Sequence, residues 1–224
     1  MERREDILAC IGRGFVRLRA KGLRNTLLYG LHFLREQAAS ALLDLKYGGK
    51  LCKTDLEINR ARQQCHTMVH SHYHVLRDVF ADLPIRREDV LVDVGCGEGR
   101  VINFWLSLGL QNRLIGIEID QAVASRTRQR YRKYPNVTII HGDATANLPA
   151  EGTIFYLYNP FAAELVERFE AAVRSQGATI VYHNNRYMLP FESNGWAIRP
   201  IRPERRIYEF TAAIITPSGR AATA

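Results

Sequence analysis

The apolar residues divide the chain into an N-terminal part with helical periodicity and a C-terminal part in which short and long apolar patterns alternate. From residue 26 to 46, leucines and alanines recur every three or four positions and stop at a pair of glycines, which predicts an amphipathic helix. Residues 55–83 repeat this periodicity and end at Pro84. We therefore expect everything before about residue 86 to be helical.

Beyond residue 86, short β-branched or aromatic runs alternate with longer amphipathic stretches, which is typical of repeated βα units in a mostly parallel sheet. Only four residues separate the last two runs, too few for a crossover helix, so these strands should pair antiparallel. The predicted strands are 90–94, 114–118, 137–141, 153–158, 178–183, 196–201 and 206–216, and the predicted helices between them are 99–109, 121–134, 161–175 and 186–193.

This pattern predicts the fold class and the domains. The fold is expected to be α/β: a doubly wound, seven-stranded, mostly parallel sheet with an antiparallel C-terminal hairpin strand, preceded by an N-terminal helical segment. The domains are expected at residues 1–85 and 86–224. A chain of 224 residues with 46% hydrophobic residues is long enough to bury one sizeable core.

Positive charge is concentrated near the N-terminus. The net charge is +8, and residues 1–50 hold ten Lys or Arg against five acids. Residues 11–25 form a basic arm with four Arg, one Lys and no acid. We interpret this arm as a solvated or packing segment; the alternative is that it binds an acidic surface, a phospholipid or a nucleic acid.

Three features predict a cytoplasmic location. No apolar run reaches the roughly 18 residues of a membrane span, and charged residues stand where a signal peptide would have its apolar core. The four cysteines form no C-x-x-C pair and are expected to be reduced thiols; they are Cys10, Cys52, Cys65 and Cys96.

The stretch "VLVDVGCGEGR" carries glycines at alternate positions, Gly95, Gly97 and Gly99, together with Asp93 and Glu98. The third glycine falls one residue short of the dinucleotide pattern G-x-G-x-x-G. Carboxylates in the loop would also oppose a phosphate, which such loops otherwise bind through backbone N–H groups. A cofactor without phosphate but with positive groups, such as S-adenosylmethionine (SAM), fits the loop better.

Residues 90–215 resemble the class I (Rossmann-like) SAM-dependent methyltransferases, whose first motif is similar to "VDVGCGEGR". The resemblance implies that Asp93 faces the ammonium end of the cofactor. We expect Glu98 to be a solvated loop carboxylate. The resemblance further implies that the loop approaches the methionine and ribose moieties through Gly95, Cys96, Gly97 and Gly99.

Two later acids complete the resemblance. Glu118 ends the second predicted strand in "LIGIEID", where the family uses an acid to bind the ribose hydroxyls. Asp120 is the alternative, although it is better placed to cap the next helix. Asp143 and the N–H of Ala144 follow the third strand and are implied to contact the adenine. The competing interpretation is a Rossmann-like domain that serves as a non-catalytic SAM-binding scaffold or sensor.

The fourth predicted strand ends in "IFYLYNPFAAEL". Asn159, Pro160 and Phe161 resemble the (Asn/Asp/Ser)-Pro-Pro-(Tyr/Phe) motif of methyltransferases that act on amino nitrogens, with one proline fewer. The resemblance implies that Asn159 contacts the cofactor beside the transferring methyl group. It also implies that Asn159 and the carbonyl of Pro160 accept hydrogen bonds from the acceptor N–H groups, while Phe161 packs against the substrate. A helix N-cap followed by proline is the structural alternative.

These residues favour nitrogen as the acceptor, in a protein lysine or a small-molecule amine. The missing proline argues against base-flipping on DNA, whereas the basic arm keeps RNA open as a less favoured acceptor. The string Y-L-Y-N-P-F also resembles a little-characterised bacterial group of class I methyltransferases. A small-molecule O-methyltransferase is the alternative, and for it His183, after the fifth strand, is the candidate catalytic residue, with Tyr158 and Asn184 nearby in sequence.

The segment "CHTMVHSHYH" holds four histidines. We expect no metal site there, because no acid is interleaved and one helix cannot turn all four side chains to one point. The segment stands where related enzymes cover the cofactor, which suggests that Ser71, His72 or Tyr73 lines the site. For the N-terminal helix, packing on the catalytic domain is expected, with a homodimer contact or a membrane surface as alternatives.

Overall fold

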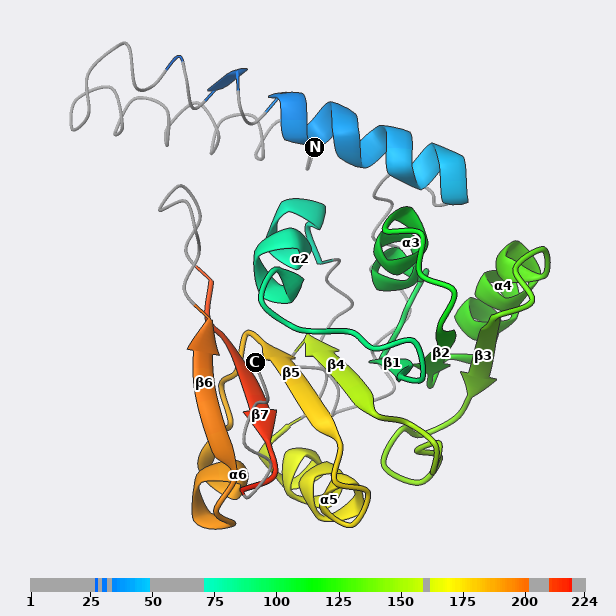
Figure 1. Cartoon of the computed structure of the whole chain (residues 1–224). Helices are drawn as coiled ribbons and strands as arrows, with labels where there is room; N and C mark the ends of the chain where they lie inside the picture. The colour runs from blue at the N-terminus through cyan, green and yellow to red at the C-terminus, as the bar shows by residue number, and fades with distance from the viewer. Residues whose placement is uncertain are drawn as a thin grey trace, which may run out of the picture. The chain divides into compact units, whose positions relative to one another are not determined.

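The computed structural model describes residues 27, 30, 31, 34–48, 71–158, 162–201 and 210–218 (Figure 1). The chain divides into two compact units, Met1–Leu42 and Leu43–Ala224. A helix runs without interruption through residues 34–47 and confirms the predicted N-terminal helix over that range. The expected boundary between residues 85 and 86 stays a prediction.

Seven strands form one sheet in the order β3-β2-β1-β4-β5-β7-β6. Strands β1 to β5 pair in parallel, and β7 lies between β5 and β6, antiparallel to both. The predicted antiparallel pairing of the last two strands is therefore confirmed. The strands are β1 (Val90–Val94), β2 (Arg113–Glu118), β3 (Val137–His141), β4 (Ile154–Tyr158), β5 (Thr179–His183), β6 (Ala197–Ile201) and β7 (Ala212–Thr216).

The predicted helices of the second unit are confirmed with shorter bounds: α2 (Tyr73–Phe80), α3 (Arg100–Ser107), α4 (Gln121–Tyr131), α5 (Ala163–Arg174) and α6 (Leu189–Ser193). Asp120 caps α4, because its side chain accepts a hydrogen bond from the N–H of Val123, as the sequence predicted. The predicted helix residues 55–70 and strand residues 206–209 lie outside the described residues.

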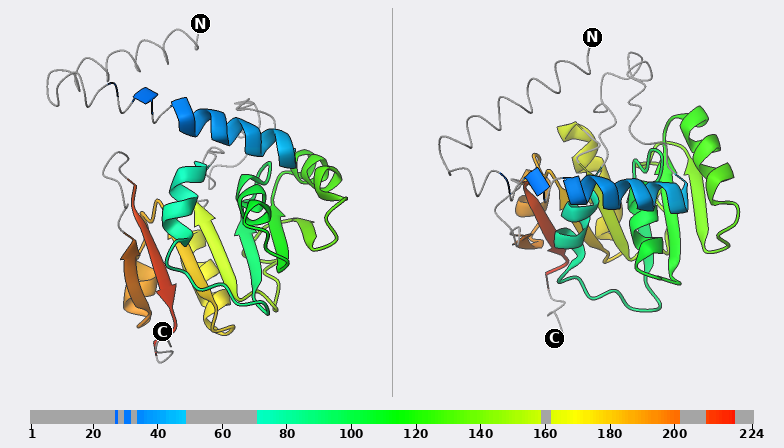
Figure 2. Two further views of the ribbon diagram at one scale, coloured as in Figure 1. Left: turned by 45° about the horizontal axis from the view of Figure 1, so that its top comes forward. Right: turned by 90° about the horizontal axis from the view of Figure 1, so that it is seen from above.

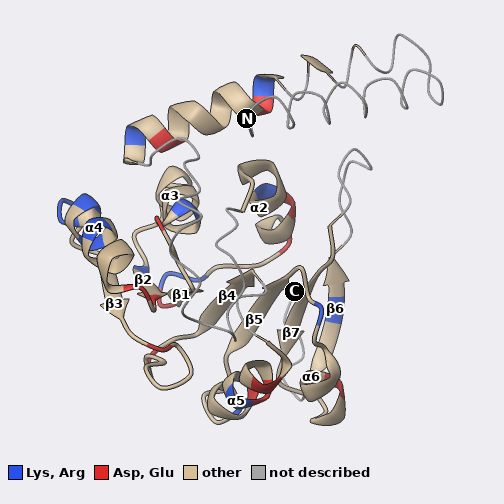
Figure 3. Cartoon of the chain, turned by 180° about the vertical axis from the view of Figure 1, so that it is seen from behind, with Lys and Arg blue, Asp and Glu red and all other residues tan. Residues whose placement is uncertain are grey.

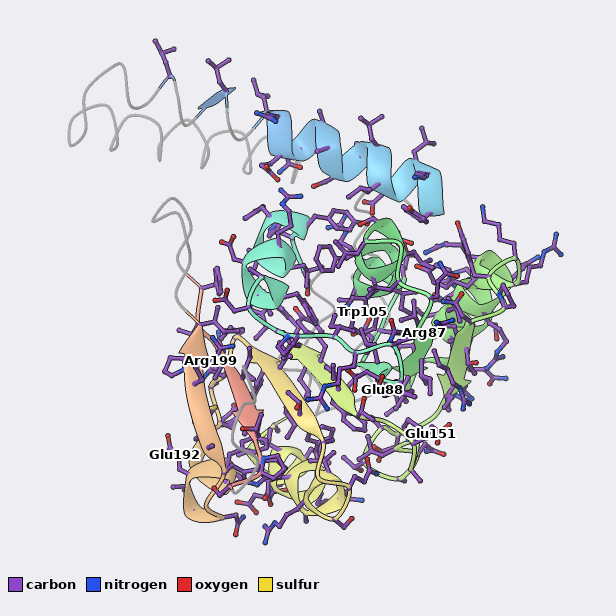
Figure 4. All side chains as sticks on the ribbon, viewed as in Figure 1. Arg87, Glu88, Trp105, Glu151, Glu192 and Arg199 are labelled. Carbon is purple, nitrogen blue, oxygen red and sulfur yellow. The ribbon has the colours of Figure 1, made fainter. Side chains whose placement is uncertain are left out.

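Helices cover both faces of the sheet (Figures 1 and 2): α2, α3 and α4 pack on one face, and α5 and α6 on the other. Successive residues of β4 alternate between these two layers, with Tyr156 in the first and Phe155 and Leu157 in the second. Trp105 of α3 (Figure 4) is fully buried in the first layer. In the part of the chain that the structure describes, no helix is long and apolar enough to cross a membrane.

The last turn of the N-terminal helix, which belongs to the second unit, is fixed through the buried carboxylate of Asp44. One carboxylate oxygen accepts a hydrogen bond from the Tyr73 hydroxyl of α2 at 2.5 Å, and the other pairs with the Arg100 guanidinium of α3 at 2.7 Å. Asp44 is 2% exposed, so both partners are needed to offset the loss of its hydration. Three segments are thereby held together where α3 begins.

A second buried acid, Glu170, joins α5 to the chain between α6 and β6. Its carboxylate accepts hydrogen bonds from the Trp196 indole at 2.5 Å and from the Asn194 amide at 3.1 Å, and it pairs with Arg174 one turn later. Glu170 is 1% exposed, so its carboxylate depends on these donors to replace the hydration that burial removes.

We predict that Glu170→Ala lowers the free energy of unfolding by about 1–3 kcal/mol, because it leaves the buried indole N–H of Trp196 without an acceptor. The control is Glu151→Ala, which removes an exposed pair with Arg113 and should cost no more than about 0.5 kcal/mol. Urea unfolding of both variants measures the difference, and equal midpoints would contradict the anchoring role of Glu170.

Candidate functional site

The glycine loop connects β1 to α3 and adopts a left-handed backbone at each glycine. The φ angles are 76° at Gly95, 52° at Gly97 and 81° at Gly99, a region that glycine enters at little cost. A Cβ at Gly99 would lie 2.5 Å from the Tyr131 hydroxyl oxygen. Gly99 is therefore required both by its backbone conformation and by the side chain packed against it.

Strand β2 and helix α4 hold this loop in place. The N–H groups of Gly95 and Cys96 both donate to the carbonyl of Ile117 at 2.9 Å. From α4, the Thr127 hydroxyl donates to the Gly97 carbonyl at 2.9 Å, and the Tyr131 hydroxyl donates to the Gly99 carbonyl at 2.6 Å. Because hydroxyl groups of α4 bind the loop carbonyls, the loop keeps one conformation.

Cys96 contributes to the loop by packing. Its side chain is buried, and Gly116 of β2 has no room for a Cβ because the Cys96 sulfur would lie 2.7 Å from it. Burial raises the pKa of the Cys96 thiol well above its usual value, with the nearby Asp93 adding to the effect. The thiol is therefore protonated and unreactive, and only the backbone of Cys96 can serve a ligand.

Glu98 is not the solvated carboxylate expected from the sequence. Its side chain is 19% exposed and lies 3.9 Å from the Arg130 guanidinium of α4. Arg130 also donates to the Glu98 backbone carbonyl. Figure 3 shows that α4 is rich in basic residues, so an acidic loop residue beside it is stabilised by charge. Glu98 is thus a further attachment of the loop to α4.

Asp93 lies in β1, two residues before the first loop glycine, and is 3% exposed. Its Oδ2 atom is buried and has no hydrogen-bond partner among the described residues. Burial raises the pKa of Asp93 well above its usual value, and the nearby Glu118 carboxylate raises it further. A buried carboxylate without a donor is costly, and a cationic ligand at this position would remove that cost.

Glu118 ends β2 beside the loop and is 6% exposed. Its carboxylate accepts hydrogen bonds from the Gly97 N–H at 2.9 Å and the Asp120 N–H at 2.8 Å, one on each oxygen. Burial raises the pKa of Glu118, and these two backbone donors partly oppose the rise. Each carboxylate oxygen has a second lone pair, so the oriented carboxylate can still accept from a pair of hydroxyl groups.

Asp143 follows β3 and forms a tight local turn. Its Oδ1 atom accepts hydrogen bonds from the N–H and the hydroxyl of Thr145, at 2.8 and 2.9 Å. Ala144 beside it is buried. The turn fixes the direction of the Asp143 carboxylate. Asp143 lies at the same edge of the sheet as Glu118, because Glu118 ends β2 beside His141, the last residue of the parallel strand β3, and Asp143 follows two residues later.

Three side chains, one from β4, one from the end of β5 and one from directly before α2, form a buried hydrogen-bonded chain. The Tyr156 hydroxyl lies 2.8 Å from the Ser71 hydroxyl and 2.8 Å from Nδ1 of His183. All three residues are at most 4% exposed. Burial lowers the pKa of His183 to about 3, with a smaller effect from His72. His183 is therefore a neutral imidazole near pH 7.

Aromatic rings enclose His183. The Tyr158 ring stands edge-on to the imidazole with ring centres 4.3 Å apart, and the Phe210 ring lies 5.5 Å away. Asn184, the next residue, has a positive φ of 54°, a conformation that asparagine tolerates better than most residues. The chain therefore turns sharply as it leaves β5, and an apolar wall forms at this end of the sheet.

Three predicted site residues lie outside the described residues, namely Asn159, Pro160 and Phe161. His66 and His70 of the histidine-rich segment, where no metal site is expected, lie outside them as well. Among the residues that are described, no three His, Cys, Asp or Glu side chains are grouped so as to hold a metal ion. His72 and His74 stack with ring centres 5.4 Å apart. Burial lowers the pKa of His72, and the nearby Arg100 lowers it further.

Sequence reasoning missed the side chains that support the site from other elements. The α4 side chains that contact the loop are Thr127 and, about one helical turn later, Arg130 and Tyr131. This spacing was the available signal that one face of the helix packs against the loop. Tyr156 lies within an apolar strand, so nothing in the sequence indicated a polar role. Its hydroxyl is recognised as part of a hydrogen-bonded chain only from the positions of Ser71 and His183 in the structure.

Comparison with known proteins agrees with this geometry. Residues 91–187 match a protein-family model described as "Methyltransferase domain". No curated protein sequence matches the chain. An RNA methyltransferase from Salinibacter ruber, solved with S-adenosyl-L-homocysteine, matches with a TM-score of 0.52 at 23% identity, over 69% of this chain and 97% of that chain.

Two further structures show the same fold. Human N-acetylserotonin methyltransferase, solved with SAM, matches with a TM-score of 0.52 at 12% identity, over 63% of this chain and 51% of that chain. A putative tRNA (m1A22) methyltransferase of Streptococcus pneumoniae matches with a TM-score of 0.50 at 10% identity, over 70% of this chain and 73% of that chain. Residues 91–187 thus match a methyltransferase domain, and the solved structures, two of them crystallised with SAM or S-adenosyl-L-homocysteine, share its fold.

We predict that Gly99→Ala destabilises the protein more than Gly109→Ala. Both glycines have positive φ, 81° and 73°, so both changes incur the left-handed penalty of roughly 1–2 kcal/mol. A Cβ at Gly109 meets nothing within 4 Å, whereas at Gly99 it meets the Tyr131 hydroxyl. Urea unfolding should show the larger loss for Gly99→Ala, and equal losses would contradict the close packing against Tyr131.

Proposed function

We propose that this chain transfers the methyl group of SAM to a nitrogen atom, in a protein lysine or a small-molecule amine. The observation that carries this choice is the state of His183, which is buried, hydrogen-bonded to Tyr156 through Nδ1 and lowered in pKa to about 3. The donor half of the proposal rests on the carboxylates beside the glycine loop.

The residues beside the loop fit SAM and disfavour a phosphate-bearing cofactor. SAM has a cationic ammonium and a cationic sulfonium in its methionine part, and the buried Oδ2 of Asp93 has no donor in the described part of the chain. Asp93 and Glu118 are close enough for one carboxylate to raise the pKa of the other. A ligand with positive charge relieves this repulsion, whereas a phosphate would add to it.

We assign the remaining contacts by the direction of each group. Glu118, oriented by the N–H groups of Gly97 and Asp120, accepts from the two ribose hydroxyls. Asp143, with Oδ1 occupied by Thr145, accepts from the adenine amino group through Oδ2, beside the N–H of Ala144. The exposed backbone of Gly95 allows the methionine part to lie directly on the loop.

When bound, SAM supplies a methyl group that its sulfonium charge has already activated for displacement. The residues of the chain therefore have to position two reactants and exclude water rather than generate a reactive species. The wall of Tyr158, Phe210 and neutral His183 provides an apolar surface at the end of the sheet where the acceptor would enter. No proton has to reach His183 for this role.

The acceptor needs a lone pair. An alkylamine with a pKa near 10.4 must lose a proton before it reacts, and an uncharged oxygen that accepts from its N–H groups directs the lone pair without acting as a strong base. Asn159 and Pro160, which follow β4 in sequence, supply such oxygens. The string Tyr156–Phe161 further suggests kinship with bacterial methyltransferases that share Y-L-Y-N-P-F.

A hydroxyl acceptor would need a general base whose pKa lies nearer to 7. His183 was the residue that the sequence suggested for that role. An imidazole with a pKa of about 3 is, however, too weak a base to accept a proton from a hydroxyl group at pH 7. We therefore assign His183 as a residue that positions Tyr156 and the aromatic wall. The structural neighbours are named as acting on RNA and on N-acetylserotonin, so their fold alone does not select the acceptor.

We predict that Asp93→Asn weakens SAM binding by about 10- to 100-fold, because it removes a charge-assisted contact. The same change should not destabilise the free protein. The raised pKa of Asp93 means that the free energy of unfolding falls as pH rises above the unfolded value of 3.8, and asparagine removes this loss.

The pH dependence gives an independent measurement for the same residue. A cationic ligand favours ionised Asp93, so the affinity of the wild type should rise with pH up to the raised pKa and SAM binding should release protons. Calorimetry in buffers of different ionisation enthalpy measures this release. Asp82→Asn, an exposed carboxylate, is the matched control; a pH response that persists in Asp93→Asn would refute the assignment.

Methyl transfer itself is tested with methyl-labelled SAM and a panel of lysine peptides and small amines. We predict that Asn159→Ala reduces transfer by at least about 100-fold while SAM binding stays within a few-fold of wild type. Label recovered in methyllysine or in an N-methylated amine after chromatography of the product indicates N-methylation, and label lost as methanol in mild alkali would indicate a methyl ester. SAM binding without transfer to any acceptor would favour the scaffold alternative.

A further inference from the structure

Helix α4 and the turn that follows it gather positive charge. Residues 121–134 hold four Arg, one Lys and no acid, and Figure 3 shows the basic residues along α4. Outside this segment, residues 51–224 hold 16 Lys or Arg against 18 acids, so the excess of cations in this part of the chain comes from one element. We call its cations the basic face; they are Arg126, Arg128, Arg130, Arg132 and Lys133.

The four arginines form two rows along the outward side of α4. At about 100° per residue, Arg126 and Arg130 lie on one border of this side. Arg128 and Arg132 lie on the other border. The residues between the two rows are exposed and either small or polar; they are Ala122, Ser125 and Gln129. A negatively charged ligand that lies along the helix would therefore meet cations on both sides and no bulky side chain between them.

Folding uses only part of this charge. Arg128 donates twice to a backbone carbonyl of β3, at 3.1 and 2.9 Å, and Arg130 is held by Glu98. The exposed side chains of Arg126 and Arg132 form no hydrogen bond or ion pair with another residue that the structure describes. Like charges four residues apart destabilise a helix, and the helix dipole favours cations only in the last turn, whereas Arg126 lies in the middle of α4. The fold therefore does not account for Arg126 and Arg132.

The chemistry of the outward side of α4 favours a nucleic-acid backbone over a membrane or a protein. The large hydrophobic side chains that are exposed in the described chain all lie outside α4. The helix thus lacks the apolar residues with which a membrane-surface helix enters the lipid and with which a protein interface forms its core. Interfaces with nucleic acids are instead polar and strongly positive, and a guanidinium group binds phosphate oxygens through two parallel hydrogen bonds.

We propose that the basic face of α4 binds the phosphodiester backbone of a nucleic acid. Arg126 and Arg132 contact phosphates directly, and Arg128 adds the N–H groups that β3 leaves free. Contacts to phosphates carry no base readout, so charge rather than sequence determines this binding. Helix α4 packs on β3, and β2 and β1 separate β3 from β4 and the acceptor side in the sheet order. The proposal therefore goes beyond the proposed function and does not depend on the methyl acceptor.

Fluorescence anisotropy of the full chain with a labelled single-stranded RNA of about 20 nucleotides tests this proposal. The variant Arg126→Gln/Arg132→Gln should bind the RNA at least about tenfold more weakly at about 50 mM salt. The slope of log affinity against log salt should become shallower by about 1.4, because two phosphate contacts are lost. The variant Arg126→Lys/Arg132→Lys keeps the charges and should keep the salt slope, but it should recover only part of the affinity because lysine cannot bind phosphate in the same bidentate way.

A matched variant separates the basic face from net charge. Arg168→Gln/Arg199→Gln removes the same charge from exposed positions on α5 and on β6 (Figure 4), and β6 is the sheet edge opposite to β3. This variant should bind the RNA like wild type, with the same salt slope. SAM binding by every variant confirms that the protein is folded, and RNA binding without SAM keeps this test separate from that of methyl transfer.

Competition with unlabelled RNA and DNA of the same sequence identifies the source of the phosphates, and equal competition by both supports recognition of the shared backbone. Three results would overturn the proposal. The first is the absence of wild-type binding to RNA and to DNA at about 50 mM salt. The second is an equal loss of binding, or no loss, in the Arg126→Gln/Arg132→Gln and Arg168→Gln/Arg199→Gln variants. The third is a loss, in the α4 variant, of binding to polyglutamate or to phosphatidylglycerol vesicles while nucleic-acid binding stays unaltered, which would assign the basic face to an acidic protein or a membrane.

Discussion

The left-handed turn of the glycine loop is the constraint on which the rest of the site depends. Strand β1 delivers Asp93 beneath the loop, and helix α3 starts directly after it. The loop can make this turn only with glycine at its left-handed positions, and α4 then locks it through Thr127 and Tyr131. Because the carbonyls are held from behind, the exposed side of the loop stays open for a ligand to approach the backbone.

The position of the loop against β2 also determines the electrostatics of the site. The buried carboxylates of Asp93 and Glu118 lie near each other; burial raises the pKa of both, and the Glu118 carboxylate raises the pKa of Asp93 further. A protein built only for stability would replace such groups. Backbone donors orient Glu118, whereas Asp93 keeps a buried oxygen with no donor in the described chain. The free energy needed to ionise the buried Asp93 is typical of binding sites, and a bound cationic ligand would offset it.

Most of the fold could be predicted from the sequence because each strand has a local signal. The boundaries of β1 and β3 were predicted as they stand, and Asp120 was recognised as the cap of α4 from its position before an amphipathic run. The place of β7 between β5 and β6 has no such signal, because strand order is decided by packing between distant segments. The expected solvation of Glu98 failed for the same reason, since Arg130 comes from another helix.

The site residues also differ in whether local sequence or packing between distant segments determines them. Acids that end strands can be located by counting, because parallel strands end at one edge of the sheet. The state of His183 cannot be found in this way, because its lowered pKa comes from burial and from a hydrogen bond to Tyr156, which in turn contacts Ser71, 85 positions away in sequence. The same contact joins Ser71, directly before α2, to the end of β5. Any displacement of Ser71 would therefore be transmitted through the Tyr156 hydroxyl to His183 and to the Tyr158 ring beside it.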